Sequence, residues 1–367
     1  MKLETELAFL KINAAKFYAG GWITECLANS APEDILKKDP LELSFETGIS
    51  VQKAASFLEK ASSFDAVSEM EKIIKAGYSV FFFSQEGYPE CFLNIPDPPV
   101  AFYVRGKFET FTSLAVVGTR KVDEYGIKQT EKITYGVASA GLAIVSGLAR
   151  GVDTLAHRAA LKAGGRTAAV IGSGLDNIYP PENRKLAAEI CEHGGFILSE
   201  YPLNEPPLKI NFPLRNRLIS ALSWGVLVIE GDYPSGSLIT ARHALSQGRE
   251  VLAVPGRVDN PLSNGPNKLI KEGAIAVSSW QDVLDAMPSR LAGEFSAVKQ
   301  KPETDRSQEL KGELKRVYLL ISKNQGINSD ELSCACALPV SKVLNLLFEL
   351  ETAGLVAQRA GRYYTVD

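Results

Sequence analysis

The sequence lacks several features that would place it quickly in a common class of protein. No apolar run reaches the length of about 18 residues that a membrane helix requires. Residues 1–21 carry charges throughout and hold no uninterrupted apolar core, so they do not read as a signal peptide. The five cysteines are scattered, and only Cys334 and Cys336 are close, at a C-x-C spacing that suits zinc poorly. These absences predict a cytoplasmic protein with reduced thiols and no membrane contact.

The sequence also has little net charge. Its 40 Lys and Arg residues against 43 Asp and Glu residues give a formal net charge of −3. Any nucleic-acid site must therefore be a local basic patch rather than a property of the whole surface. With 367 residues, 45% of them hydrophobic and 23% charged, the chain has the composition of an ordinary soluble protein of two or three domains.

Familiar catalytic and cofactor patterns are missing too. The P-loop pattern G-x-x-x-x-G-K-[ST] is absent, and so are S-x-x-K, G-x-S-x-G and H-E-x-x-H. A dinucleotide fingerprint is nearly present, since Gly172 and Gly174 follow an apolar run. However, Asn177 stands where the third glycine belongs, and Tyr179-Pro180-Pro181 interrupts the helix that would receive a pyrophosphate. We therefore expect no cofactor, no metal and no enzymatic activity.

Four ionisable residues are candidates for catalytic groups. Asp153 and His157 are four residues apart and would share a helix face. We expect a contact between them that fixes the loop at 146–151 rather than an acid–base or metal pair. Glu200 and Glu230 end two apolar runs, and we expect them to hydrogen-bond loop amides or neighbouring arginines rather than to serve hydrolysis.

Short apolar runs alternate with amphipathic segments through the middle of the chain. Strands that are apolar throughout, each followed by a helix, indicate a parallel sheet covered on both faces. We predict an α/β domain over 66–287 with a doubly wound, mostly parallel, extended Rossmann-like sheet, in which runs at 79–83 and 100–104 add strands. The other predicted strands are at 114–117, 143–145, 167–171, 196–198, 225–229, 250–254 and 274–277.

The two ends of the chain differ from this middle part. Residues 1–64 read as a helical domain of the SAM or helix-hairpin-helix kind, with Ser50 capping a helix. Both DNA contact and plain packing stay open for it. Residues 288–311 read as a flexible linker, and 312–367 as a winged helix with early caps at Ser329 and Ser341. Residues 308–367 hold 7 basic and 7 acidic residues, which favours a protein contact or accessory role over duplex binding.

Glycines and small hydroxyl residues follow most of the predicted strands. In a parallel sheet these strand exits meet on one rim, where backbone N–H groups at helix N-termini can hold an anion. Several such exits on one rim predict a site for a phosphate-bearing ligand. The expected phosphate-contacting residues are Gly118, Thr119, Gly147, Gly172, Ser173, Gly174, Ser235, Gly236 and Ser237.

The segment 209–217, KINFPLRNR, combines three cations and one aromatic ring. Prolines at 206, 207 and 213 keep its first part out of a regular helix. An extended backbone with cations and a ring suits a single-stranded sugar-phosphate chain with unstacked bases. Taken alone, the segment fits a loop entering a helix equally well, with Phe212 in the core and solvated arginines.

The strand-exit motifs, taken in order, resemble the DNA-processing protein A family (DprA, also called Smf). They are GTR at 118–120, SGLARGVDTLAH at 146–157, GSGLDNIYPPEN at 172–183, SEYP at 199–202, FPLRNRLIS at 212–220, PSGSLITARHAL at 234–245, VPGR at 254–257 and SNGPNKLIKEGA at 263–274. The resemblance implies binding of single-stranded DNA, loading of the RecA recombinase in natural transformation, and a homodimer. Single-strand-binding protein is a further candidate partner. The implied DNA contacts are Arg120, Lys209, Phe212, Arg215, Asn216 and Arg217.

Two other functions remain open on the sequence. One is a LOG-like nucleotide N-glycosidase, because the family is similar in fold to LOG-type proteins. The other is a nucleotide-sensing module. For the DNA-binding function, four cations that each neutralise a phosphate predict a salt slope of roughly −3, about −0.7 for each phosphate.

Overall fold

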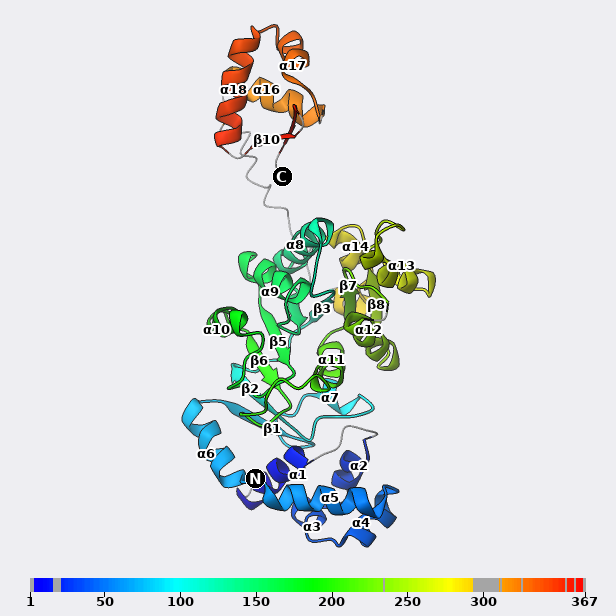
Figure 1. The fold of residues 1–367 in the computed structure, drawn as a ribbon. Helices are drawn as coiled ribbons and strands as arrows, with labels where there is room; N and C mark the ends of the chain where they lie inside the picture. Colours follow the sequence, from blue (N-terminus) through cyan, green and yellow to red (C-terminus); the bar gives the residue numbers. More distant parts are fainter. Residues whose placement is uncertain are drawn as a thin grey trace. The chain divides into compact units, whose positions relative to one another are not determined.

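The computed structural model describes residues 3–15, 21–233, 235–292, 310, 312–324, 326–353, 355–359 and 361–365. The chain forms two compact units, Met1–Ser296 and Ala297–Asp367. Figure 1 shows the elements of both units in chain order.

A nine-stranded sheet forms the centre of the first unit, in the order β1-β2-β6-β5-β4-β3-β7-β8-β9. The seven strands from β3 to β9 pair in parallel, whereas β2 pairs antiparallel with both β1 and β6. The predicted doubly wound, mostly parallel sheet is confirmed, and the two runs near residues 80 and 100 extend it beyond β6. The strands are β1 Ser79–Phe82, β2 Ala101–Gly106, β3 Ser113–Val117, β4 Ala143–Ser146, β5 Thr167–Ile171, β6 Phe196–Ser199, β7 Gly225–Val228, β8 Glu250–Ala253 and β9 Ile275–Ala276.

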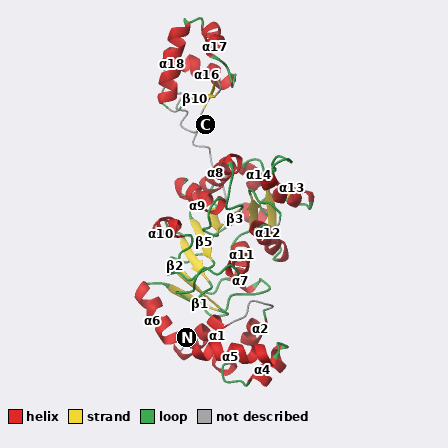
Figure 2. Ribbon diagram, viewed as in Figure 1, coloured by secondary structure: helices red, strands yellow, loops and turns green. Residues whose placement is uncertain are grey.

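Helices cover the sheet on both faces, as the red and yellow elements of Figure 2 show. Neighbouring residues of a strand point to opposite faces, which is why every position of β3 is apolar or small. Leu114 and Val116 belong to one buried cluster, and Ala115 and Val117 to another. The helices between the strands are α7 Glu90–Leu93, α8 Glu124–Ser139, α9 Val152–Lys162, η1 Pro181–Asn183, α10 Arg184–Glu192, α11 Asn211–Ala221, α12 Gly236–Ser246, η2 Pro261–Ser263 and α13 Asn264–Lys271, followed by α14 Trp280–Asp285 and α15 Ser289–Ala292.

The direction of winding changes between β3 and β7. The chain runs from β3 through β4 and β5 to β6 on one side, and from β7 through β8 to β9 on the other. The loops that leave β3 and β7 meet there, where the N–H of Thr119 donates to the carbonyl of Glu230 at 2.8 Å. In open α/β sheets this switch point is where ligands bind.

The N-terminal helices pack against the β1–β2 side of the sheet. Their apolar residues share a core with it, and the rings of Phe9 and Phe82 stack at 5.3 Å. Ser50 caps α5 by accepting from the N–H of Lys53, as predicted. The predicted domain border at 64–66 falls between α5 and α6, inside the first compact unit. The helices are α1 Leu3–Ala15, α2 Trp22–Asn29, α3 Pro32–Ile35, α4 Pro40–Thr47, α5 Val51–Ser63 and α6 Ala66–Ala76.

The second unit is the predicted winged helix. Three helices, α16 Gly312–Lys323, α17 Ser329–Cys336 and α18 Val340–Thr352, enclose their own apolar core, and β10 Val356–Arg359 pairs with β11 Arg362–Thr365. The predicted caps were wrong. Asn328 caps α17 in a reciprocal capping box with Glu331, because its amide oxygen reaches the third helical N–H, and Pro339 precedes α18.

Most of the predicted linker, 293–309 together with 311, lies outside the described residues, and α15 occupies 289–292.

Among the described helices, none is by itself long and apolar enough to cross a membrane. Only α17 and α18 taken together pass that test, and they are bent by 110°.

Candidate nucleic-acid interface

The basic segment 209–217 begins as a turn and continues as a helix. α11 starts at Asn211, two residues before Pro213, because a proline in the first helical turn removes no intrahelical hydrogen bond. The non-helical conformation predicted for the first part therefore ends at Ile210. The hydroxyl of Tyr201 donates to the carbonyl of Asn211 at 3.2 Å and ties the start of α11 to the loop after β6.

Three of the predicted DNA contacts lie together at this helix start. Lys209 is exposed and makes no hydrogen bond or ion pair with any residue that the structure describes. Phe212 is half-buried, and its ring packs over Gly172, where an added Cβ would come within 3.1 Å of the ring. The exposed Arg120, at the exit of β3, places its guanidinium carbon 5.3 Å from the centre of this ring.

Arg215 lies inside the domain instead. It is 4% exposed, and its Nη1 donates to the carbonyls of Gly147 (2.9 Å) and Val170. Burial lowers the pKa of Arg215 to about 10, although the nearby Asp153 opposes that shift. An added Cβ at Gly147 would meet Arg215 Nη2 at 2.6 Å and Asp153 Oδ2 at 2.7 Å. Arg215 therefore holds the exits of β4 and β5 together.

Asn216 and Arg217 are also buried, at 8% and 5% exposed. The Asn216 amide donates to the carbonyl of Gly236 at 3.2 Å and accepts from Arg215 Nε. Arg217 makes a two-pronged ion pair with Glu200, with N–O distances of 2.7 and 2.6 Å, and Asp97 adds a second carboxylate at 3.2 Å. These carboxylates raise the pKa of Arg217 despite its burial. Both side chains stabilise the fold around α11.

Several groups expected to contact phosphate are occupied within the protein. The N–H of Gly147 donates to Asp153 at 3.1 Å, and that of Gly174 donates to the carbonyl of Glu205 at 2.9 Å. The hydroxyl of Ser173 donates to the carbonyl of Asn177. Gly118 packs so closely that an added Cβ would come within 2.5 Å of Val152. At these loops small residues serve close packing of one loop on another.

The N-terminus of α12 is less occupied. Ser235 is its N-cap residue and makes no capping hydrogen bond; its hydroxyl pairs with that of Ser237 at 2.8 Å. Gly236 is exposed, and its amide belongs to the first turn of an 11-residue helix, where N–H groups lack intrahelical partners. This end lies at the switch point, next to the exit of β3.

The carboxylates near the rim have structural partners, as expected. Glu200 pairs with Arg217, and Glu230 accepts from the N–H of Asp123 at 3.3 Å. Asp153 holds the loop at 146–151 through the amides of Gly147 and Ala149. The expected contact between Asp153 and His157 was wrong, because His157 Nδ1 bonds the hydroxyl of Thr167 at 2.7 Å. Among the described residues, no group of three or more His, Cys, Asp or Glu side chains is placed to hold a metal.

One aromatic residue of the rim was missed as a candidate. The sequence marks Tyr179 only as part of a helix-breaking stretch, yet its ring lies 5.9 Å from that of Phe212. The sequence held one signal for Tyr179: it follows the predicted strand at 167–171, and the arginine-bearing loop at 146–151 follows the strand before it.

A model of the DNA recombination-mediator protein A family matches residues 79–288, and a model of the DprA winged helix domain matches 301–362. Protein Smf of Escherichia coli (strain K12) is 39% identical over 321 residues, which is 87% of this chain and 85% of that protein. The chain belongs to the DNA recombination-mediator protein A family.

Other members of the family have solved structures or close sequences. The DNA processing protein DprA of Bacillus subtilis is 43% identical over 58% of this chain and 73% of its own length. The X-ray structure of DprA from Streptococcus pneumoniae matches 78% of this chain and 99% of that one, with a TM-score of 0.67 and 37% identity. DprA from Helicobacter pylori, whose structure is described by its single-stranded DNA binding mode, matches 60% of this chain and 97% of that one, with a TM-score of 0.53 and 33% identity.

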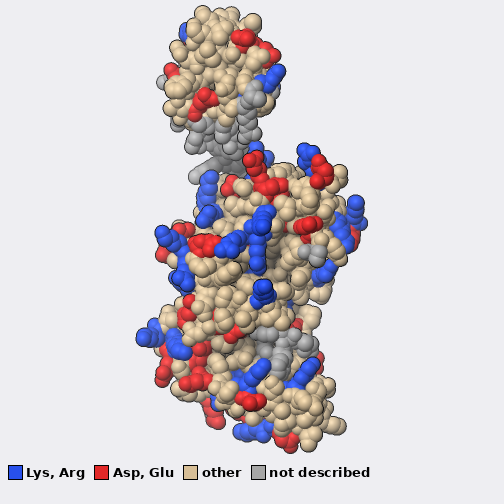
Figure 3. Space-filling view, viewed as in Figure 1, with Lys and Arg blue, Asp and Glu red and all other residues tan. Residues whose placement is uncertain are grey.

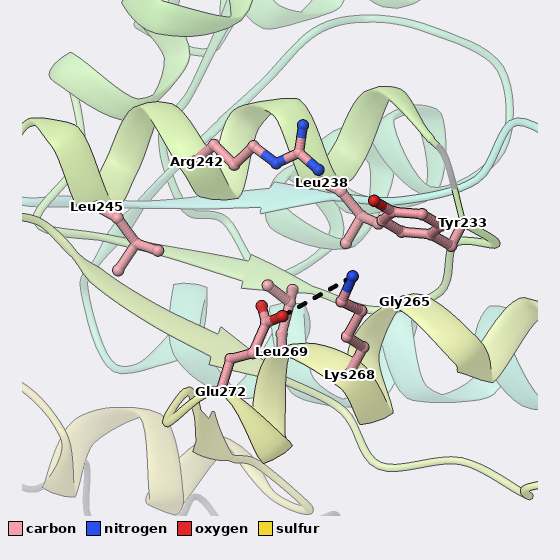
Figure 4. A pocket seen from close by; sticks show the side chains of 8 residues that line it. All are labelled: Tyr233, Leu238, Arg242, Leu245, Gly265, Lys268, Leu269 and Glu272. Carbon is pink, nitrogen blue, oxygen red and sulfur yellow. Dashed lines mark ion pairs between the residues drawn. The ribbon is translucent and has the colours of Figure 1, made fainter.

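The surface of this family member carries two further features. Figure 3 shows Lys and Arg side chains gathered in the part of the first unit where Figure 1 labels β3 and α11. A separate groove runs between α12 and α13, where Lys268 Nζ lies 3.9 Å from the centre of the Tyr233 ring and 3.8 Å from Glu272 (Figure 4). Leu238, Leu245 and Leu269 also line it, and Leu245 is 61% exposed.

Proposed function

We propose that the protein binds single-stranded DNA without sequence preference at the rim formed by Lys209, Phe212 and Arg120. The observation that carries this proposal is the position of two exposed cations beside one accessible ring, on the edge where parallel sheets bind ligands. Family membership supports it, and so does the Helicobacter pylori relative, whose structure is described in terms of a single-stranded DNA binding mode.

The chemistry of the three residues matches a single strand. Lys209 and Arg120 neutralise phosphates, and the ring of Phe212 takes the face of a base. A base–aromatic stack contributes about 1–3 kcal/mol and tolerates any base. Arg120 leaves the ring when DNA binds, which costs about 0.5–1 kcal/mol of cation–π contact at an exposed site. The stack and the phosphate contact together exceed that cost.

The other predicted residues divide into two roles. The N-terminus of α12, with Ser235, Gly236 and Ser237, offers amides and hydroxyls to a phosphate. Arg215, Asn216 and Arg217 position the rim from inside, as do the glycine loops at 118, 147 and 172–174.

Fluorescence anisotropy with a labelled 20-nucleotide strand and the matching duplex tests the site. Lys209→Ala and Arg120→Ala should weaken single-strand binding for all sequences alike, and Phe212→Leu should reduce the preference over duplex while keeping an apolar side chain. Lys37→Ala is the matched control, because Lys37 is an exposed, ion-paired lysine of the helical N-terminal part. Unchanged affinity in all three site variants would refute the proposal.

We also propose that the protein loads RecA onto that strand in natural transformation, displacing single-strand-binding protein where it covers the DNA. Support comes from family membership alone. The test measures RecA filament formation on strands that are coated with single-strand-binding protein, with RecA ATPase activity as the readout. Addition of the wild-type protein should shorten the lag before ATPase activity appears, and addition of the Lys209→Ala variant should not. A lag that the wild type leaves unchanged would remove this part of the function.

A homodimer through the groove between α12 and α13 is a further proposal. Exposed apolar groups there, Leu245 at 61% and Tyr233 at 50%, favour burial against a second copy. Light scattering after gel filtration should give a dimer for the wild type and a monomer for Leu245→Glu. Leu41→Glu, on α4, changes a leucine that is 69% exposed and should stay dimeric. A wild-type monomer would contradict the proposal.

No observation favours a nucleotide N-glycosidase at this rim. Such chemistry needs a carboxylate that is free to act on a bound nucleotide, whereas Glu200 is held by Arg217 and Glu230 is 1% exposed.

A further inference from the structure

The ring of Phe212 is one member of a row of four side chains on the rim. Arg120 lies over Phe212 at 5.3 Å, Phe212 lies 5.9 Å from Tyr179, and the guanidinium carbon of Arg150 lies 6.0 Å from the centre of the Tyr179 ring. Cations thus stand at both ends of the row and two rings in its middle. The two ring planes are tilted by 56° to each other.

The loop that carries Tyr179 is firmly held. The Asn177 amide donates to the carbonyl of Asn204 at 2.8 Å, and the Asn183 amide donates to the carbonyl of Leu148 at 2.9 Å and to the hydroxyl of Thr154 at 2.8 Å. A ring on such a support loses little conformational freedom when a ligand binds. Tyr179 itself is half-buried, so part of its ring stays accessible.

We propose that the single-stranded DNA site extends past Phe212 onto Tyr179 and Arg150, so that two adjacent bases each face one ring and Arg150 neutralises a phosphate beyond them. This inference rests on the proposed function of the Phe212 rim. Two tilted rings suit bases that have left the regular stack, because each base then finds its own ring plane. Duplex DNA, with its bases stacked on each other, cannot use such a pair.

Glu182 limits this extension in the free protein. Its carboxylate pairs with Arg150 Nε at 2.5 Å, and both side chains are about half exposed. The hydrogen bond from Arg150 lowers the pKa of Glu182, so the carboxylate is charged at neutral pH. An incoming phosphate competes with Glu182 for the same guanidinium and is repelled by its charge. Glu182 therefore weakens binding at this end of the row.

The experiment compares four variants by anisotropy with a 20-nucleotide oligo(dT) across a salt series. Tyr179→Leu should weaken binding roughly 5- to 150-fold, the effect of losing one base–ring stack, and Tyr179→Phe should keep wild-type affinity. Arg150→Ala should make the salt slope shallower by about 0.7. Glu182→Gln should bind more tightly than the wild type.

A matched control lies at the start of β5, the strand whose end leads into the loop that carries Tyr179. Arg166 precedes that strand, stacks over Phe111 at 5.2 Å and pairs with Glu109 at 3.3 Å. Arg166→Ala removes the same kind of arginine from a similar ring and carboxylate, and should leave affinity and salt slope unchanged. Thermal unfolding of each variant separates a lost contact from a damaged loop, and Arg150→Ala alters an exposed side chain only.

The outcomes separate this inference from the function on which it rests. If the wild type binds no oligonucleotide, the proposed function fails and the extension with it. If Lys209→Ala weakens binding while Arg150→Ala and Glu182→Gln match the wild type, the function stands and the extension is refuted. Tighter binding by Glu182→Gln together with a shallower slope for Arg150→Ala supports the extension.

Discussion

Cations that lie close in the sequence act in different ways at the rim. Lys209 and Arg120 are exposed, whereas Arg215 and Arg217 are buried among carbonyls and carboxylates. A buried arginine needs partners for its donors, because an unpaired charge inside a protein is costly. Burial therefore decides which cations can meet phosphate, and residue type alone does not.

Removal of Arg217 should destabilise the protein strongly. Arg217→Ala removes the two-pronged ion pair from the buried carboxylate of Glu200, and breaking such a pair costs about 3–5 kcal/mol. Urea unfolding should show this loss for Arg217→Ala and none for Arg120→Ala. The double change Arg217→Met with Glu200→Gln should recover much of the stability, since it removes both charges. Equal stability of Arg217→Ala and the wild type would mean that the pair contributes nothing.

Glu230 should make the stability depend on pH. It is 1% exposed, its Oε1 has no hydrogen-bond partner among the described residues, and burial raises its pKa from 4.5 to about 7. The folded state thus keeps the proton up to higher pH than the unfolded state. Its contribution is fully present below about pH 4.5 and is lost as the pH rises towards 7.

Glu230→Gln imitates the protonated form and should remove this dependence. The melting temperature of the variant should exceed that of the wild type at pH 8 and approach it at pH 5. Asp123, which faces Glu230 and caps α8, keeps its charge in both proteins, so the difference reports on Glu230. A constant difference across this pH range would show that Glu230 is ionised throughout.

At the scale of elements, the sequence predicted the strands better than the rim. Short runs that are apolar at every position, such as 114–117, are typical of central strands, and a glycine or small hydroxyl residue at most exits marks the turn that follows. The partners of polar side chains could not be predicted from the sequence in the same way. Asp97 and Glu200 are 120 and 17 residues from Arg217 in the sequence, and only the fold brings them together around it.

The N-terminal helices hold the loop that leads to the rim. Asn13, on α1, donates to the carbonyl of Glu200 at 2.9 Å, and Glu69, on α6, accepts from the N–H of Leu203 at 2.7 Å. Both contacts fall on the loop between β6 and α11. The helical part of the first unit is therefore a support for the segment that carries Lys209.

Glu69→Ala should loosen that loop. It leaves the buried N–H of Leu203 without an acceptor, at a cost of about 1–3 kcal/mol. Hydrogen exchange over 200–210 should become faster, and single-strand affinity should fall without a change in any residue of the rim. Glu71→Ala alters an exposed glutamate of the same helix and should do neither. Unaltered exchange in Glu69→Ala would argue against the support role.

At the scale of the whole molecule, a net charge of −3 means that the proposed DNA binding depends on a few local cations. The slope of log K against log salt reports how many of these cations neutralise a phosphate. Lys209 and Arg120 alone predict roughly −1.4, and Arg150 makes it roughly −2, at about −0.7 for each phosphate. The sequence-based value of roughly −3 assumed that Arg215 and Arg217 also meet phosphate. A measured slope near −3 would mean that the buried arginines become exposed to DNA.

The winged helix should contribute nothing to single-strand affinity. Its helix α18 corresponds to the recognition helix that helix-turn-helix proteins place in the major groove. Here that helix exposes Val340, Leu344 and Phe348, and its Lys342 is paired with Glu313 at 2.7 Å. Residues 308–367 hold 7 basic and 7 acidic residues, so no basic field compensates.

A chain ending at residue 296 tests this directly, because it retains every residue of the rim and the whole first compact unit. Its affinity for a 20-nucleotide strand and its salt slope should equal those of the full chain, since an apolar helix face releases no counterions from DNA. The matched change in the full chain is Phe348→Ala, which should also leave DNA binding unchanged. A loss of affinity in the shortened chain, with a shallower slope, would instead assign phosphate contacts to the winged helix.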